Sequence, residues 1–327
     1  MLSEPRVERT ALLRAVDRQY GLAADSIEFL PVGWTAAAYV LRVGGERYFL
    51  KLWPGGHGAD AAVGCLPFVR RLGSSGFRAR VAVPLPTKTG ELSARLPTGV
   101  MVLTPFLPGT TLPGWPDWPS AVLTELGRTL VELHAFEAGT VLPFRERFSV
   151  EIADELRLHL ADKVVRPYRG ELLDQLDRLA DLQKSARKAV AGRPGGGLVA
   201  CHTDLTGDNL LVAPDGRLSV LDWDEARLAP PEQDLALLLH GEQPVSVTPL
   251  REVLKVYPHD LHPDLIGFFR LRRSVEDFTA RVLRLHNDTL SPDETADALD
   301  GLDRWGASQW RHLDETLAQL PPAARQA

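Results

Sequence analysis

The chain has 327 residues, of which 44% are hydrophobic and 24% charged, with a formal net charge of -6. This length corresponds to about two domains and is enough to bury a substantial core. The acidic balance argues against a general nucleic-acid binder, because counterion release needs a basic surface, and it is compatible with a cationic small-molecule partner.

Cysteine content and hydropathy indicate the compartment. The chain has two cysteines, Cys65 and Cys201, which are far apart in the sequence. Neither belongs to a pair of residues with the spacing of metal ligands. No apolar run approaches the roughly 20 residues that cross a bilayer, and the first residues lack a basic stretch followed by an apolar one. We therefore expect a cytoplasmic protein with no nucleic-acid or membrane partner, present as a monomer or weak dimer.

The first third of the chain predicts a helix followed by a twisted antiparallel sheet. Apolar residues at helical spacing mark residues 8–20, and strand patterns cover residues 27–31, 39–43 and 47–53. The last two strands are joined through Gly44-Gly45, a strong hairpin signal. A helix over residues 59–72 and an apolar strand over 100–107 follow.

The remainder of the chain is mainly helical. A segment rich in Pro and Gly, residues 108–119, predicts a domain boundary. Helical patterns then cover residues 121–136, 152–160, 171–190 and 263–286. One interruption predicts short strands at 198–201, 210–212 and 218–221, the last two joined by Pro214-Asp215-Gly216. The predicted fold class is therefore α+β.

Polar residues follow the strands of this interruption. His202-Thr203-Asp204 comes after the first strand, Asn209 precedes the second, and Asp222-Trp223-Asp224 comes after the third. Phosphoryl transfer from ATP requires a carboxylate near the attacking hydroxyl and oxygen ligands for magnesium. Asp204 would orient the acceptor hydroxyl and take its proton, while Asn209 and Asp222 would bind the metal.

The order of these residues decides between two interpretations. Asp204, Asp208 and Asn209 could simply cap turns, as such residues often do. The pattern H-x-D-x-x-x-x-N followed by a second Asp after a strand matches the protein-kinase order of catalytic loop and metal-binding Asp. We therefore favour a catalytic site, in which His202 braces the turn without reacting.

The same segment resembles a known family. Residues 201–212, CHTDLTGDNLLV, and 221–225, LDWDE, resemble the aminoglycoside phosphotransferase family of antibiotic-modifying kinases. The continuation ARLAPPEQDL, to residue 235, is most similar to its spectinomycin phosphotransferase branch. The resemblance implies a protein-kinase-like bilobal fold. Residues 1–107 would form a nucleotide-binding lobe with an antiparallel sheet, and residues 108–327 a larger helical lobe for catalysis and substrate binding.

Several residues of the first lobe match nucleotide-binding positions of the family. Lys51 lies inside an apolar strand and matches the nucleotide lysine, although a strand lysine with its head in solvent is common. The loop 33–38 has one glycine, so Gly33 and Thr35 either contact phosphate or form an ordinary hairpin loop. The resemblance places the main chain near Thr104 and Phe106 at the adenine edge.

One departure from the kinase pattern concerns the partner of Lys51. Kinases pair this lysine with a Glu on the following helix, but Asp60 is the only acid between Lys51 and Glu91. Either Asp60 forms that pair, or Lys51 relies on phosphate alone. Asp60 could equally be an exposed residue at the start of a helix.

The resemblance also suggests where an acceptor binds. Acidic residues after the metal-binding Asp and on late helices receive a cationic aminocyclitol in this family, which makes Asp224, Glu225, Glu276 and Asp277 candidates. The alternative is that these acids are solvated or that Glu276 pairs with an arginine one turn earlier.

Three further residues have two interpretations each. Trp305 and Trp310 could form the wall of a sugar site or belong to the core. Asp234 resembles a family position that supports the catalytic loop, and it could also cap a helix.

We therefore predict an ATP-dependent O-phosphotransferase that uses ATP or another nucleoside triphosphate with Mg²⁺. Its acceptor would be an aminoglycoside or aminocyclitol, spectinomycin-like, which would give antibiotic resistance. A metabolic kinase acting on choline, an amino sugar, homoserine or methylthioribose is the alternative, because the motif handles ATP and not the acceptor. A catalytically silent nucleotide-binding module is a third hypothesis.

Overall fold

The structure, a computed structural model, describes residues 4–33, 35–56, 58–112, 118–139, 141–193, 196–241, 246–257, 259–287 and 290–320. The chain divides into two compact units. Unit one comprises residues 1–111, 137–143 and 208–226, and unit two comprises residues 112–136, 144–207 and 227–327. Within the described ranges, no helix has both the length and the apolar character needed to span a membrane.

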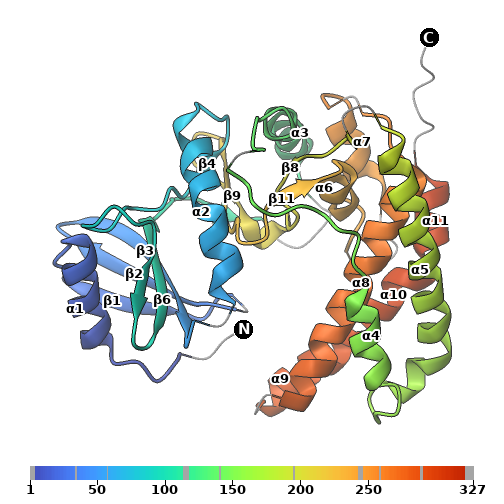
Figure 1. Ribbon diagram of the computed structural model, residues 1–327, viewed down its shortest axis with the longest axis horizontal. Coiled ribbons are helices and arrows are strands. Elements are labelled where there is room, and N and C mark those ends of the chain that lie inside the picture. Colours follow the sequence, from blue (N-terminus) through green and yellow to red (C-terminus); the bar gives the residue numbers. More distant parts are fainter. Residues whose placement is uncertain are drawn as a thin grey trace. The chain divides into compact units, whose positions relative to one another are not determined.

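Unit one contains the antiparallel sheet predicted from the sequence, with strand order β1-β2-β3-β6-β5 (Figure 1). Its strands are β1 (Ser26–Leu30), β2 (Ala37–Val43), β3 (Glu46–Pro54), β5 (Ala94–Leu96) and β6 (Gly99–Pro105). Gly44 and Gly45 join β2 to β3 with φ angles of 54° and 89°. Two consecutive left-handed residues are what a type I′ hairpin requires, which confirms the predicted turn.

A helix packs on each face of this sheet (Figure 1). Helix α1 (Arg9–Tyr20) buries Leu12 and Val16 in one cluster with Leu50 and Leu52 of β3. Helix α2 (Ala59–Ser74) packs on the opposite face in a second cluster that contains Trp53. Side chains alternate between the faces of a strand, so Lys51 lies on the same face as Trp53, toward α2.

Unit one also contains a four-stranded sheet in the order β4-β10-β9-β7. Its strands are β4 (Arg80–Val81), β7 (Thr110–Thr111), β9 (Leu210–Val212) and β10 (Leu218–Val220). Strands β9 and β10 form the predicted hairpin, and they pair with β7 and β4 respectively. This pairing places residues 208–226 in unit one, although they lie far beyond the predicted boundary after residue 107.

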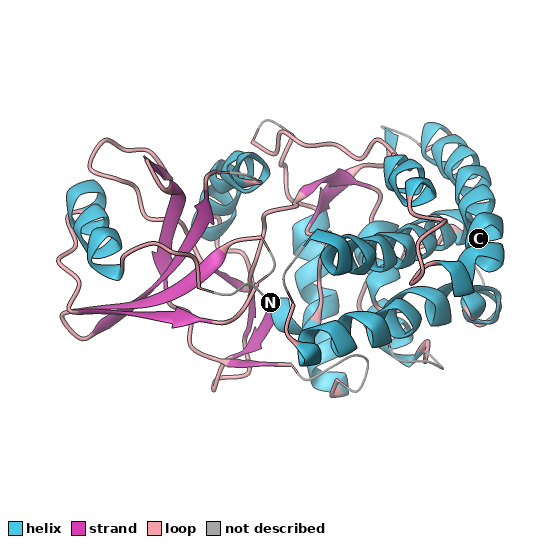
Figure 2. Cartoon of the chain, turned by 90° about the horizontal axis from the view of Figure 1, so that it is seen from below, coloured by secondary structure: helices cyan, strands magenta, loops and turns pink. Residues whose placement is uncertain are grey.

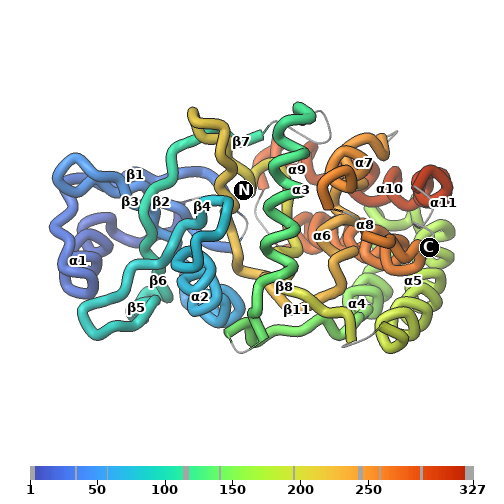
Figure 3. The backbone as a smooth tube through the Cα atoms, turned by 90° about the horizontal axis from the view of Figure 1, so that it is seen from above, coloured from blue at the N-terminus to red at the C-terminus, as the bar shows by residue number. Residues whose placement is uncertain are grey.

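Unit two is mainly helical (Figure 2). Its helices are α3 (Ser120–His134), α4 (Glu151–Leu158), α5 (Arg169–Ala191), α6 (Glu232–Leu237), α7 (Thr248–Leu254), α8 (Pro263–Asn287), α9 (Pro292–Gly301), α10 (Ser308–Arg311) and α11 (Leu313–Ala318), with a π-helical turn at Leu302–Ala307 and a 3₁₀ turn at Arg166–Tyr168. Helices α3 and α7 lie side by side although more than a hundred residues of chain separate them (Figure 3). The four long helices predicted from periodicity are all present, with ends shifted by two residues or fewer.

A short antiparallel sheet pairs β8 (Val199–Cys201) with β11 (Arg227–Ala229). Strand β11 was not predicted from the sequence. Helix α8 buries an apolar stripe at helical spacing, which includes Phe268, Val275 and Phe278. Trp310 is 2% exposed, so the core interpretation holds for this residue.

Candidate active site

Lys51 is held by two carboxylates of unit one. Its Nζ lies 2.7 Å from Oδ1 of Asp222 and 2.9 Å from Oδ2 of Asp224. Asp60 has a 92% exposed side chain and lies 3.6 Å from Arg95. The expected pair with Asp60 is therefore wrong, because the acidic partners of Lys51 come from a segment 171 and 173 residues later in the chain. Asp60 is the exposed residue at a helix start that the sequence also allowed.

The charges of this triad are strongly interdependent. Burial by itself would lower the pKa of Lys51, but the carboxylates of Asp224 and Asp222 outweigh burial and hold that pKa above its ordinary value. Burial raises the pKa of Asp224 to about 6, with the Lys51 charge acting in the opposite direction and repulsion from Asp222 adding to the increase. The site thus holds two carboxylates close together through one ammonium group.

The local chain geometry sets the directions of Asp222 and Asp224. Trp223, between them, is 5% exposed and packs edge-to-face against Phe68 at 5.7 Å, while its Nε1 donates to the carbonyl of Val220. Asp222 has φ of 57°, a left-handed conformation that non-glycine residues seldom adopt and that Asp tolerates better than most. Leu221 N donates to the carbonyl of Asn209 at 2.9 Å, so the backbones of the two predicted metal-binding positions are neighbours.

The predicted catalytic loop belongs to unit two up to Gly207. Thr203, directly before Asp204, has φ of 75°, which is an outlier for a β-branched residue. Backbone strain of this kind concentrates at functional sites. The amide N–H of Asp204 donates to Nδ1 of the buried His202 at 3.2 Å, which confirms that His202 braces the turn.

Asp234 fixes the same loop from α6. Its carboxylate accepts from the backbone N–H groups of His202 at 3.1 Å and Thr203 at 2.7 Å. It also lies 3.0 Å from Nε2 of His134, whose Nδ1 lies 2.9 Å from the hydroxyl of Tyr257. Asp234 is 1% exposed, so every contact is dehydrated. The structure thus supports the loop-supporting interpretation of Asp234.

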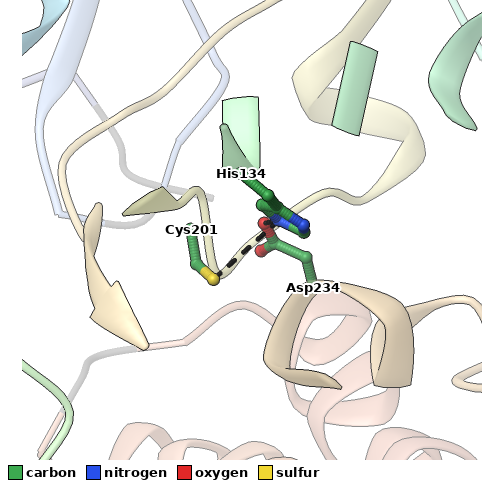
Figure 4. Close-up of side chains that lie close together, drawn as sticks. All are labelled: His134, Cys201 and Asp234. Atoms are coloured by element: carbon green, nitrogen blue, oxygen red, sulfur yellow. Dashed lines mark hydrogen bonds and ion pairs between the residues drawn. The ribbon is translucent and has the colours of Figure 1, made fainter. Parts of the chain in front are cut away.

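Cys201 completes this buried cluster (Figure 4). Its Sγ lies 3.9 Å from Nε2 of His134, and the thiol donates to the carbonyl of Ala229 at 3.5 Å. Burial raises the pKa of the Cys201 thiol well above its ordinary value. The ligand atoms of His134, Cys201 and Asp234 lie within 4.8 Å of one another. Because Asp234 already accepts two backbone N–H groups, we interpret the cluster as support for the catalytic loop.

Asp204 forms an ion pair with an arginine that sequence reasoning did not assign. Its Oδ1 lies 2.8 Å from Nη1 of Arg273, and Nε of the same guanidinium lies 3.1 Å from Oδ2 of Asp277. One turn of α8 also pairs Arg272 with Glu276 at 3.4 Å, as the alternative interpretation expected. The i, i+4 spacing of both pairs was a visible signal, but nothing local indicated that Arg273 would meet Asp204.

Glu276 also lies at the edge of a cavity of about 260 Å³ in unit two. Two of its lining residues, Arg272 and Glu146, form a buried bidentate pair at 2.9 and 3.0 Å. The other lining residues are Arg145, Arg147, Ser149, Glu151, Ile152 and Arg227. The cavity is therefore polar and carries charges of both signs.

The remaining predicted nucleotide residues lie on the sheet of unit one. Gly33 has φ of 86° in the connection between β1 and β2, and Thr35 is exposed there, while Trp34 lies outside the described residues. Thr104 pairs with Phe49 across β6 and β3. The N–H of Phe106 donates to the carbonyl of Arg47 at 3.0 Å, so this N–H is already engaged.

Comparison with known proteins shows the family of this chain. The model of the phosphotransferase enzyme family, APH, matches residues 26–265. Protein StrN of Streptomyces griseus is 27% identical over 300 residues, which cover 83% of this chain and 86% of that protein.

Two solved structures share the fold. Spectinomycin phosphotransferase APH(9)-Ia, in complex with ADP and spectinomycin, superposes with a TM-score of 0.72 at 19% identity, covering 96% of this chain and 99% of that one. Choline kinase LicA from Streptococcus pneumoniae gives 0.65 at 15% identity, covering 95% and 99%. The fold is therefore protein-kinase-like, as the sequence predicted. The chain belongs to the phosphotransferase enzyme family and is an ATP-dependent kinase with an alcohol group as acceptor.

Proposed function

We propose that the chain phosphorylates a hydroxyl group of an aminoglycoside or aminocyclitol antibiotic, spectinomycin-like, and thereby confers resistance. The observation that carries this proposal is the Asp204 carboxylate, which follows a strained residue and is fixed by an ion pair at 2.8 Å. The resemblance of residues 226–235 to the spectinomycin branch supports the choice of acceptor, as do the ligands named for the similar structure, ADP and spectinomycin.

In the proposed mechanism, Asp204 accepts a hydrogen bond from the acceptor hydroxyl and takes its proton as the oxygen attacks phosphorus. Lys51 binds the nucleotide phosphates, and Gly33 and Thr35 lie over them. The backbone near Thr104 and Phe106 binds adenine.

The donor set of Asn209 and Asp222 fits magnesium. A carboxylate and an amide oxygen are the hard ligands that this ion prefers. The position of the Lys51 ammonium, 2.7 Å from Asp222, supports the view that this carboxylate accepts a cation. Bound Mg²⁺ would neutralise charge on the phosphates. Asn209 and Asp222 would hold it, and Asp224 would remain beside Lys51.

Existing ion pairs at the predicted acceptor-binding carboxylates affect how a cationic acceptor can bind. Asp224, Glu276 and Asp277 each pair with a basic side chain, and Glu225 is exposed. An ammonium group would therefore have to join or replace an existing ion pair.

A metabolic kinase is the second candidate function. The fold is shared with choline kinase LicA, so the fold alone permits a small metabolite acceptor. We also propose a cytoplasmic protein, because Cys65 and Cys201 are buried and form no disulfide. We propose that it is a monomer or a weak dimer.

A phosphorylation screen tests these functions. The full chain with Mg²⁺ and radiolabelled ATP or GTP would be offered spectinomycin, streptomycin, other aminoglycosides, choline and homoserine, with phosphate transfer measured for each. We expect transfer to an aminocyclitol, with spectinomycin the preferred acceptor. Transfer to a metabolite alone would contradict the resistance proposal, and no turnover with any acceptor would favour the silent module.

A further inference from the structure

The guanidinium of Arg273 joins two carboxylates that come from different parts of unit two. It donates through Nη1 to Asp204, in the loop after β8, and lies through Nε against Asp277, one turn further along α8. The side chains of Arg273, Asp204 and Asp277 are 28%, 32% and 20% exposed. This partial burial limits screening by solvent. The bridge formed by Asp204, Arg273 and Asp277 is therefore stronger than a surface ion pair.

Asp277 is anchored in turn by a buried histidine. Nε2 of His240 lies 3.0 Å from Asp277, and a guanidinium nitrogen of Arg270 meets Nδ1 of the same ring. Arginine cannot accept a hydrogen bond, so Nδ1 accepts and the ring proton lies on Nε2, the ring nitrogen 3.0 Å from Asp277. Burial lowers the pKa of His240 to about 4, which agrees with a neutral ring. Trp305 stacks on the imidazole at 5.9 Å.

We propose that Arg273 is a positioning residue. It holds the Asp204 carboxylate in the orientation needed to take the proton from the acceptor hydroxyl, and Asp277 and His240 hold Arg273 in place. This inference rests on the proposed function. Five N–H donors in a planar fork let one guanidinium serve both acids, which an ammonium does with less directional control. A carboxylate has about four lone-pair sites, so Asp204 can keep Arg273 and still bind a hydroxyl.

The bridge gives Asp277 a different role from the acceptor contact predicted from the sequence. Asp277 is partly buried beside Arg273 and His240. The Arg273 charge and the His240 contact outweigh the effect of burial and hold the pKa of Asp277 well below its ordinary value. It stays ionised and orients Arg273. Asp277 therefore acts on catalysis through the arginine.

The first test separates positioning from substrate binding. Arg273→Gln and Arg273→Lys would be compared with wild type, using spectinomycin or the best acceptor of the screen. We expect Arg273→Gln to lower kcat by about 10- to 100-fold with the KM for ATP within about twofold, and Arg273→Lys to recover part of the loss. A raised acceptor KM with unchanged kcat would instead make Arg273 a binding residue and overturn the proposal.

Arg284→Gln is the matched control. Arg284 lies on the same helix, 11 residues or about 16 Å further along at 1.5 Å per residue, and its guanidinium pairs with Glu294 at 3.3 Å. It loses a comparable ion pair away from Asp204, so we expect kcat within about twofold of wild type. An equal loss of kcat in Arg284→Gln would mean that general weakening of α8, and not positioning, explains both effects.

A double-mutant cycle tests the bridge itself. Asp277→Asn should also lower kcat, and adding it to Arg273→Gln should cost little more than Arg273→Gln alone, because both changes break one arrangement. Losses that simply multiply would show that Asp277 acts independently of Arg273 and would overturn the bridge.

The positioning role of Arg273 can be tested even if no acceptor is phosphorylated. Crystal structures of wild type and Arg273→Gln would then be compared at the Asp204 side chain. We expect a changed χ1 or two conformers of Asp204 in the variant, with the backbone of residues 202–204 unmoved. An unchanged Asp204 would overturn the positioning role, whereas failure of the screen alone would count only against the proposed function.

Discussion

Three charged side chains of unit one interact directly with one another. Lys51, Asp222 and Asp224 lie close enough that the charge of each changes the proton affinity of the others. Two acids beside one base leave an excess negative charge, which suits a site proposed to bind magnesium and nucleotide together. The elevated pKa of Asp224, about 6, follows from its burial and its proximity to Asp222.

Two variants should shift the pKa of Asp224 in opposite directions. Lys51→Met should raise the pKa of Asp224 above about 6, because the lysine charge is what lowers it, and Asp222→Asn should lower that pKa by removing repulsion. Carboxyl carbon chemical shifts measured by NMR against pH would report both. Shifts in the reverse directions would contradict the triad geometry.

The same group contributes to the pH dependence of stability. Its folded-state pKa of about 6 lies above the ordinary 3.8, so the folded state binds this proton more tightly. That contribution to stability is present below about pH 4 and is lost as pH rises through about 6. Asp224→Asn should therefore flatten the fall of Tm between these values, as measured by calorimetry.

Asp204→Asn tests the proposed proton acceptor. The amide keeps the shape of the side chain but cannot take a proton at neutral pH, so we expect turnover to fall by about 10²- to 10⁴-fold. Nucleotide affinity, measured by calorimetric titration, should change little. Equal losses in turnover and nucleotide affinity would mean that Asp204 has a structural role.

At the scale of elements, the loop after β8 depends on α6. Asp234 replaces water as acceptor for two buried N–H groups, those of His202 and Thr203, and this compensates for the strained φ of Thr203. Helix α3 contributes His134 to the same carboxylate. Two helices thus fix one short loop, which gives the backbone of the following residue, Asp204, a defined position.

Asp234→Ala should destabilise the fold by about 3 kcal/mol or more, because each buried donor left without an acceptor costs about 1–3 kcal/mol. Urea denaturation would measure the loss. Asp174→Ala, an exposed acid on α5, is the control and should change stability by less than about 0.5 kcal/mol. A similar effect in both variants would argue that the loop finds other acceptors.

At the scale of the whole molecule, the proposed site residues divide between the two units. Unit one contains Lys51, Asn209 and Asp222, and unit two contains Asp204. The chain passes from unit two to unit one at residues 207 and 208 and returns at 226 and 227. Metal and nucleotide binding are therefore expected to stabilise unit one more than unit two.

Nucleotide binding should stabilise the protein in a metal-dependent way. Ligand at 100 times its dissociation constant adds about 2.7 kcal/mol to the free energy of unfolding. We expect Mg²⁺ with ADP to raise Tm more than ADP with EDTA, as measured by thermal shift, and Asp222→Asn to abolish the difference. Asp60→Asn, at the exposed acid of α2, should retain it. A full metal effect in Asp222→Asn would remove this residue from the metal site.

The elements with clear periodicity and the reaction class could be predicted from local sequence patterns. Gly44-Gly45 specified a hairpin, the α8 stripe specified a buried helix face, and the spacing of His202, Asp204 and Asn209 indicated a kinase. Each of these is a local pattern, in which the residues that matter lie within one element or one loop.

Only the tertiary structure decided which side chains meet. The partners of Lys51 lie 171 and 173 residues away, and Arg273 meets Asp204 across 69 residues. Strands as short as β4 and β11 form because a neighbouring strand completes their hydrogen bonds, and not because of their own pattern. Ion pairs and strand pairs of this kind depend on how faces pack, which local periodicity does not encode.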